Sequence, residues 1–370
     1  MMTVNNFSPG FAAKSLLIFL LISGATALRA CDVPVFRYAL ERWPVETYEV
    51  TVYHRGPLAR QKSEVVETLK NHSQALVPYS NFIVRDVDLE LKPEPDPQVL
   101  ELSPGADKPP YLVVRYPGWL KQERIIWSAA LSAGSARGLI DSPLRQQIAE
   151  KILGGETAVW VLVESGDREK DDTAAGIIKK TLAGMEKKLR LPDAVTGVPP
   201  QGAPDLRIDF SLVRLSRNDP EETFLIRMLT RSEADLEQYG SWPMAFPLYG
   251  RGRLLYALVG RGITEENVSE ACAFLAGPCA CEIKDSNSGM DLLILADWDE
   301  ETGGSWVDAV ATPPLSTLAS MAESSGAGEP GSGDDNSKNR LYYNIFLALA
   351  LVVAVIAIVS FRLLRSGRGK

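Results

Sequence analysis

Apolar residues between positions 31 and 300 recur with two different spacings, each confined to short segments. A strand is predicted at 158–164, where the apolar residues are continuous up to Val163, a pattern typical of a strand buried inside a parallel sheet. Residues 171–190 carry apolar side chains at helical spacing, which indicates a helix. Strands and helices of these two kinds alternate along the chain, so the pattern predicts a mixed α/β fold.

The order of the predicted elements repeats. In the first half a strand at 111–116 turns into a second strand at 124–129, and a helix follows that ends at Gly154. In the second half a hairpin turns at 250–252, and Thr264 caps the helix that follows. Upstream of the first hairpin the pattern predicts a helix at 35–43, a strand at 48–54, a helix at 63–71 and a strand at 82–89. A hairpin followed by a helix is therefore predicted twice, at 111–154 and at 246–276.

The first 30 residues match a signal peptide. Lys14 precedes an apolar run at 16–22 that is too short to cross a bilayer core of ~30 Å. Ala30 suits the position before a cleavage at Cys31, and residues 25–27 offer a second A-x-A site. We therefore expect residues 1–30 to be removed and the remainder to be exported.

An uncharged stretch at 341–361 predicts a single transmembrane helix, because at roughly 1.5 Å per residue it can span the bilayer. The tail at 362–370 carries only basic charges, so the positive-inside rule places the C-terminus in the cytoplasm. Residues 301–340 are predicted to be a flexible tether. Its acidic Gly/Ser-rich part at 323–339 gives an r.m.s. reach of roughly 20–25 Å. These features predict a single-pass membrane protein with the bulk of the chain extracytoplasmic.

Composition narrows the candidate chemistry. The chain of 370 residues has 47 acidic and 39 basic residues, and its formal net charge is −8. No basic patch stands out, which argues against a nucleic-acid partner. Only two histidines occur, His54 and His72, and neither lies beside a recognisable nucleophile motif. The sequence therefore predicts no metal site and no cofactor.

The element order resembles the thioredoxin family, in which a β-α-β unit precedes a hairpin and a closing helix. The resemblance implies two tandem thioredoxin-like α/β domains, at 31–155 and 156–300. In that family a Cys-x-x-Cys pair opens the first helix, and residues Cys31-Asp32-Val33-Pro34 occupy the corresponding helix start. The second cysteine of the pair is replaced by Pro34, and residues 165–170 of the second half contain no cysteine. The resemblance thus implies domains that lack the redox pair.

Three of the four cysteines lie close together near the end of the second half. Cys272 falls on the apolar face of the last predicted helix, and Cys279 and Cys281 share one face of a short extended stretch. Cys272 is predicted to pair with Cys279 or Cys281, a link worth about 2–3 kcal/mol on the loop-entropy model. A redox-active pair or a metal site is the weaker alternative, because C-x-C supplies only two ligands.

Cys31 allows three interpretations. Leu28 and Ala30 fit a lipidation signal, although Arg29 fits it poorly. A helix N-terminus would lower the pKa of the Cys31 thiol and make it a candidate reactive thiol. A bridged or buried structural cysteine is the third interpretation, and it is the one that we favour.

Two functions of different classes follow. The first is a non-catalytic interaction module of the cell envelope that binds another envelope or membrane protein, and it is favoured because neither expected position carries a dithiol. The alternative is a thiol-disulfide oxidoreductase, or a monothiol accessory, that uses Cys31.

Overall fold

The computed structural model describes residues 31–74, 80–91, 108–117, 125–196, 199, 205–279, 284, 289–299 and 305–311. All of these residues belong to one compact unit. Within these ranges, no helix has both the length and the apolar character needed to cross a membrane. The predicted signal peptide at 1–30, the membrane helix at 341–361 and the tail at 362–370 lie outside the described residues and stay predictions.

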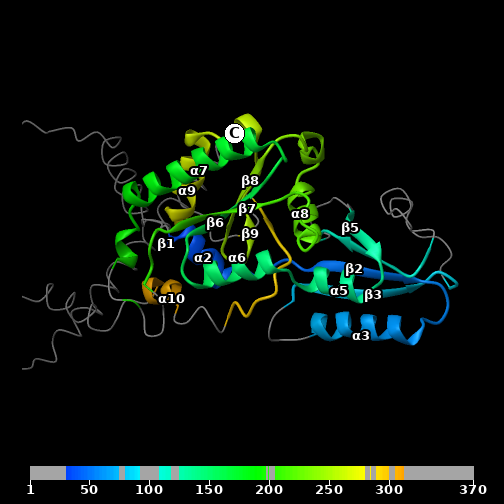
Figure 1. Ribbon diagram of the computed structural model, residues 1–370. Coiled ribbons are helices and arrows are strands. Elements are labelled where there is room, and N and C mark those ends of the chain that lie inside the picture. The colour runs from blue at the N-terminus through cyan, green and yellow to red at the C-terminus, as the bar shows by residue number, and fades with distance from the viewer. Residues whose placement is uncertain are drawn as a thin grey trace, which may run out of the picture. The chain divides into compact units, whose positions relative to one another are not determined.

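The first of two mixed sheets has the strand order β3-β2-β4-β5 (Figure 1). Its strands are β2 (Tyr48–His54), β3 (Phe82–Asp88), β4 (Tyr111–Arg115) and β5 (Ile125–Ala130). β2 is parallel to β3, whereas the β2–β4 and β4–β5 pairs are antiparallel. Side chains alternate along β2, so Val50 and Val52 enter one core cluster and Tyr53 enters another.

The second sheet has the order β12-β9-β8-β6-β7, and a short strand β10 also pairs with β8. Its strands are β6 (Ala158–Val163), β7 (Phe210–Leu215), β8 (Met244–Tyr249), β9 (Arg253–Leu254), β10 (Leu258–Val259) and β12 (Met290–Asp291). β6 lies between a parallel and an antiparallel neighbour and is buried at every residue. The continuous apolar run at 158–164 is therefore an interior strand, as predicted.

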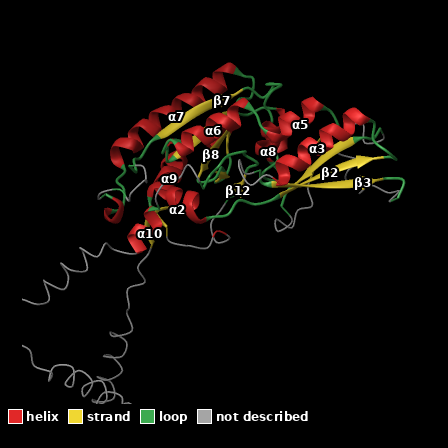
Figure 2. Cartoon of the chain, turned by 90° about the horizontal axis from the view of Figure 1, so that it is seen from below, coloured by secondary structure: helices red, strands yellow, loops and turns green. Residues whose placement is uncertain are grey.

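Helices cover both faces of the second sheet. α7 (Arg168–Lys188) and α9 (Glu265–Ala276) pack on one face, where Trp160 of β6 joins their core cluster. α6 (Pro143–Leu153) and α8 (Thr223–Thr230) contribute to the other cluster with Val161. That second cluster also contains β2 and β4 residues, so one core connects the two sheets. Figure 2 shows α3 (Arg60–Gln74) and α5 (Ala133–Ile140) beside β2 and β3.

Both sheets share one order of elements, and both are compatible with a thioredoxin-like fold. β2-α3-β3 is followed by the β4–β5 hairpin and α5, and β6-α7-β7 is followed by the β8–β9 hairpin and α9. A hairpin followed by a helix therefore occurs in both halves, but the helix predicted to end at Gly154 is α6, which follows α5 and contacts β6 of the second sheet. The pattern missed α5, whose N-cap Ser132 forms a capping box with Ser135. That helix is short and glycine-containing, so its apolar periodicity is weak.

The N-terminal segment packs into the core of the second half and pairs there with β11 in a separate two-stranded sheet, which corrects the expected placement of Cys31. Residues Cys31–Pro34 form strand β1, antiparallel to β11 (Pro278–Cys279) at the end of the second half. The helix α2 (Val35–Arg42) begins only at Val35, with Pro34 at its N-cap. Cys31 is therefore not at a helix start, because the buried side chains of Val33, Val35 and Phe36 draw this segment into the core around α7 and α9.

The turn at 250–252 shows how closely α2 approaches the second sheet. Gly250 and Gly252 both have positive φ, +57° and +79°, which fits the predicted hairpin turn. A Cβ added to Gly250 would lie 2.7 Å from the Cβ of Ala39 in α2. Glycine is thus required here by the backbone conformation and by the neighbouring helix.

Part of the segment predicted as a tether is helical and packed. α10 (Trp306–Ala311) lies within the range 301–340, and Trp306 is buried in the core shared with α7 and α9. The Glu41 carboxylate of α2 accepts hydrogen bonds from the backbone N–H groups of Trp306 and Val307, each at 3.0 Å. This carboxylate satisfies the free N–H groups of the first turn and docks α10 on α2 (Figure 1).

Candidate functional site

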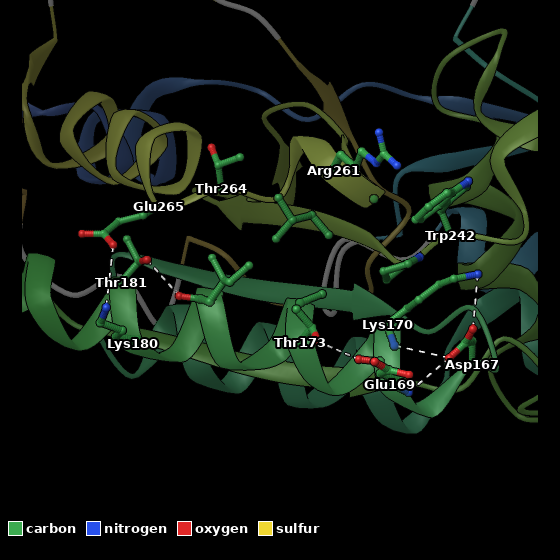
Figure 3. A pocket seen from close by; sticks show the side chains of 15 residues that line it. Asp167, Glu169, Lys170, Thr173, Lys180, Thr181, Trp242, Arg261, Thr264 and Glu265 are labelled. Atoms are coloured by element: carbon green, nitrogen blue, oxygen red, sulfur yellow. Dashed lines mark hydrogen bonds and ion pairs between the residues drawn. The ribbon is translucent and has the colours of Figure 1, made fainter.

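A groove of about 780 Å³ lies along the N-terminal half of α7. Its other wall consists of the Trp242–Pro243 segment before β8, the 3-10 helix η4 (Gly260–Gly262) and the start of α9 (Figure 3). Ala174, Ile177 and Ile263 supply apolar surface, and charged side chains surround it. A volume of this size is typical of a ligand or peptide site.

The loop that opens α7 is held by two carboxylates. Asp171 is buried and accepts hydrogen bonds from the backbone N–H and hydroxyl of Ser165, both at 2.8 Å, and from the N–H of Gly166 at 3.0 Å. Asp167 caps the helix by accepting from the N–H groups of Glu169 and Lys170. The hydrogen bond from Lys170 N–H is the largest cause that lowers the pKa of Asp167. These bonds rigidify the loop between β6 and α7.

Trp242 is the main aromatic side chain of the groove, and three residues position it. Lys170 Nζ lies 4.7 Å from the centre of its ring, a cation–π contact. Arg217 donates to the carbonyls of Glu164 at 3.1 Å and Trp242 at 3.3 Å, so it ties the end of β6 to the tryptophan. A Cβ added to Gly260 would lie 2.9 Å from the indole ring. The ring therefore packs closely against a glycine and already has the Lys170 ammonium over it.

The charges around the groove balance. Lys170 pairs with Asp167 at 3.2 Å, and Lys180 lies 3.9 Å from Glu265 across the groove. Among the described residues that line it, none is a cysteine or a histidine. The site therefore has the apolar surface and polar rim of a binding groove, without a nucleophile and base in contact.

The two histidines lie elsewhere. His54 ends β2, and its ring nitrogens lie 2.7 Å from the carbonyl oxygen of Gly56 and 2.9 Å from the Asp86 carboxylate. His72 lines a second groove of about 690 Å³ between α3 and α5. Within the described part of the chain, no three His, Cys, Asp or Glu side chains are arranged to hold a metal ion.

The three cysteines of the described ranges occupy two environments. Cys272 is fully buried in α9 with a free thiol, and burial, then Glu186, raises the pKa of that thiol to about 12. Cys279 lies in β11, where its backbone is in register with Cys31. Cys281 lies outside the described residues. The expected pairing of Cys272 with Cys279 or Cys281 stays a prediction.

Two buried polar clusters lie where the halves of the chain meet, and nothing in the local sequence pattern indicated them. In the first, Arg253 and Lys284 contact Glu46 and Asp291, with Arg253 3.3 Å from Glu46 and 3.0 Å from Asp291. Burial, then repulsion from Asp291, raises the pKa of Glu46. Glu46 lies just before β2, Arg253 lies in β9, and Lys284 and Asp291 lie before and in β12. The cluster therefore connects three distant parts of the chain.

The second cluster surrounds Arg145 of α6, which is completely buried. Its guanidinium donates to the carbonyls of Gly138, Leu139 and Leu293 and to the Ser142 hydroxyl. Burial lowers the pKa of Arg145 to about 10, so it remains a cation at neutral pH.

The carboxylate of Glu222, at the start of α8, completes this second cluster. It accepts from the Ser142 hydroxyl and from the N–H of Leu144, each at 2.6 Å. Arg145 and Glu222 thus act through Ser142 and the helix ends to hold α5, α6 and α8 together.

No protein-family model matches the chain, and no curated protein matches it.

Proposed function

We propose that the chain consists of two tandem thioredoxin-like domains, anchored to a membrane by residues 341–361, that bind another envelope or membrane protein without catalysing a reaction. One observation carries the proposal. The two loops that lead from a first strand into its helix, residues 55–59 after β2 and 164–167 after β6, contain no cysteine. These are the positions at which the thioredoxin family carries its redox pair, so binding is the function that the remaining groove supports.

The chemistry of the groove indicates the kind of partner. Its apolar surface and the Trp242 ring favour insertion of apolar side chains, and its balanced rim gives no preference for a strongly charged ligand. We expect the occupant to be an exposed segment of a membrane-proximal protein, with at least one apolar or cationic side chain that contacts Trp242.

Photo-crosslinking in native membranes tests the groove. A photoreactive residue at exposed Thr173 in the groove should capture one partner, whereas the same residue at exposed Glu150, on the opposite face of the sheet, should not. Trp242→Ala should reduce this capture about 30-fold, because a buried aromatic anchor contributes about 2 kcal/mol or more to binding. Phe274→Ala is the matched control, since Phe274 is 39% exposed on α9 outside the groove. Equal capture at both positions, or capture that survives Trp242→Ala, would contradict the proposal.

Deletion of residues 341–370 tests the anchor separately. The shortened chain should move from the membrane fraction to the soluble fraction outside the cytoplasm, because the only predicted spanning segment is gone. Fractionation and protease accessibility of the exported part measure this. A membrane-bound product after the deletion would show that another segment, or a lipid, holds the protein.

A further inference from the structure

We infer that Cys31 and Cys279 form a disulfide that ties strand β1 to β11. The inference goes beyond the proposed binding function and rests on it only for export into a compartment that permits disulfides. It also differs from the pairing that sequence spacing favours, because it joins residues 248 positions apart.

The backbone register carries the inference. β1 and β11 are antiparallel, with Cys31 opposite Cys279 and Pro34 opposite Pro278, and an irregularity lies between the two pairs. Residues directly opposite in an antiparallel pair have Cα atoms roughly 4.5–5.5 Å apart and share one face of the ladder. Disulfides need Cα atoms about 4.4–6.8 Å apart. The two positions therefore satisfy the backbone requirement for a bridge.

Neighbouring contacts hold both strands in this register. The N–H of Val35 donates to the carbonyl of Gly277 at 3.0 Å, next to the Pro34–Pro278 pair. Val33 and Leu275 are fully buried in the same core cluster, one on each side of the contact. The backbone segments on both sides are thus anchored, and a bridge requires no rearrangement of the core.

Cys272 is the poorer partner for Cys279. It lies in the last part of α9, which ends at Ala276, and is completely buried among apolar side chains. The raised pKa of its thiol leaves little thiolate to attack a disulfide.

The chemistry needs an external disulfide as oxidant. One cysteine thiolate attacks that reagent to give a mixed disulfide and release one thiol. The second thiolate then attacks the mixed disulfide, forms the Cys31–Cys279 bond and releases the second thiol. The chain loses two electrons and two protons, and the reagent gains them as two thiols. The Cys31 sulfur is then unavailable for a lipid thioether.

Peptide mapping of the full-length chain tests the link. The chain is produced with its own N-terminal segment, alkylated on extraction and digested without reductant by trypsin and chymotrypsin, which separates Cys272 from Cys279. The peptide that contains Cys31 should be joined to the peptide that contains Cys279, and reduction should abolish the joined species. Cys281→Ser and Cys272→Ser should retain it, and Cys279→Ser should lose it. The reduced chain should form the same link when treated with oxidised glutathione.

Several results would overturn the inference. The first is a Cys31 that is alkylated or lipidated on extraction and that also fails to form the link to Cys279 when the chain is treated with oxidised glutathione. The second is a joined peptide that persists in Cys279→Ser. A Cys272–Cys279 peptide would equally overturn it. A chain that is reduced on extraction but forms the link with oxidised glutathione would support the Cys31–Cys279 pairing and contradict the expected export. None of these results depends on Trp242, so the disulfide and the binding function of the groove are tested independently.

Discussion

Arg145→Ala is expected to lower the free energy of unfolding by about 3–5 kcal/mol, the range for removing one partner of a buried charged network. The substitution leaves the carbonyls of Gly138, Leu139 and Leu293 without the donor that they share. It also leaves the Glu222 carboxylate buried beside no cation. The loss should be large because Arg145 holds the end of α5 to the segment that follows β12.

Chemical denaturation of the full-length chain in detergent, followed by tryptophan fluorescence, measures this effect. Arg145→Lys should recover only a minor part of the lost free energy of unfolding. A single ammonium cannot reach the several acceptors that the planar guanidinium contacts. Arg60→Ala is the control, since Arg60 pairs with Glu64 on the surface with its side chain 93% exposed, and its loss should cost about 0.5 kcal/mol or less. Equal losses at Arg145 and Arg60 would refute the role given to the buried network.

Asp291→Asn is expected to cost about 3–5 kcal/mol for the same physical reason. The described cluster has two carboxylates, Glu46 and Asp291, and two cations, Arg253 and Lys284, all with side chains at most 12% exposed. Neutralising Asp291 leaves an excess positive charge in a site that water does not screen. The N–H of Glu46 would also lose a carboxylate acceptor at 2.8 Å.

A double-mutant cycle with Lys284→Gln gives the decisive comparison. The double variant restores electrical neutrality, so it should be more stable than the sum of the single losses predicts, with a coupling of about 1–3 kcal/mol. Asp308→Asn serves as the exposed control, because its carboxylate is 70% exposed beside Arg42. Strict additivity of the two single variants would show that Asp291 and Lys284 do not act as a charge pair.

The local pattern of the sequence was sufficient to predict most helices and strands of the fold. The run at 158–164, the helical spacing at 171–190 and the Thr264 cap correspond to β6, α7 and α9. These signals are local, because strand and helix periodicity and capping depend on residues within a few positions of one another. The same local reading missed α5 and extended the tether over α10, since a short helix has too few turns to show a period.

The candidate groove required distant segments to meet. Residues 165–170 were recognised as the stretch without cysteine, but Trp242 and Gly260 gave no signal that they would face it. Trp242 reaches the groove because Arg217 ties its carbonyl to that of Glu164, and β8 pairs with β6. Register between strands far apart in the chain brings these residues together, and it is not encoded in any single window of sequence.

The amino-acid sequence by itself determined the α/β class, the succession of hairpin and helix in each half, and the absence of cysteine from residues 165–170. It also supplies the expectation of an exported, membrane-anchored chain. Only the tertiary structure decided that β1 and α2 pack into the core around α7 and α9, and that Cys31 lies opposite Cys279. The physical reason is that apolar periodicity states which face of an element is buried, whereas the partner that buries it is chosen by packing across the whole chain.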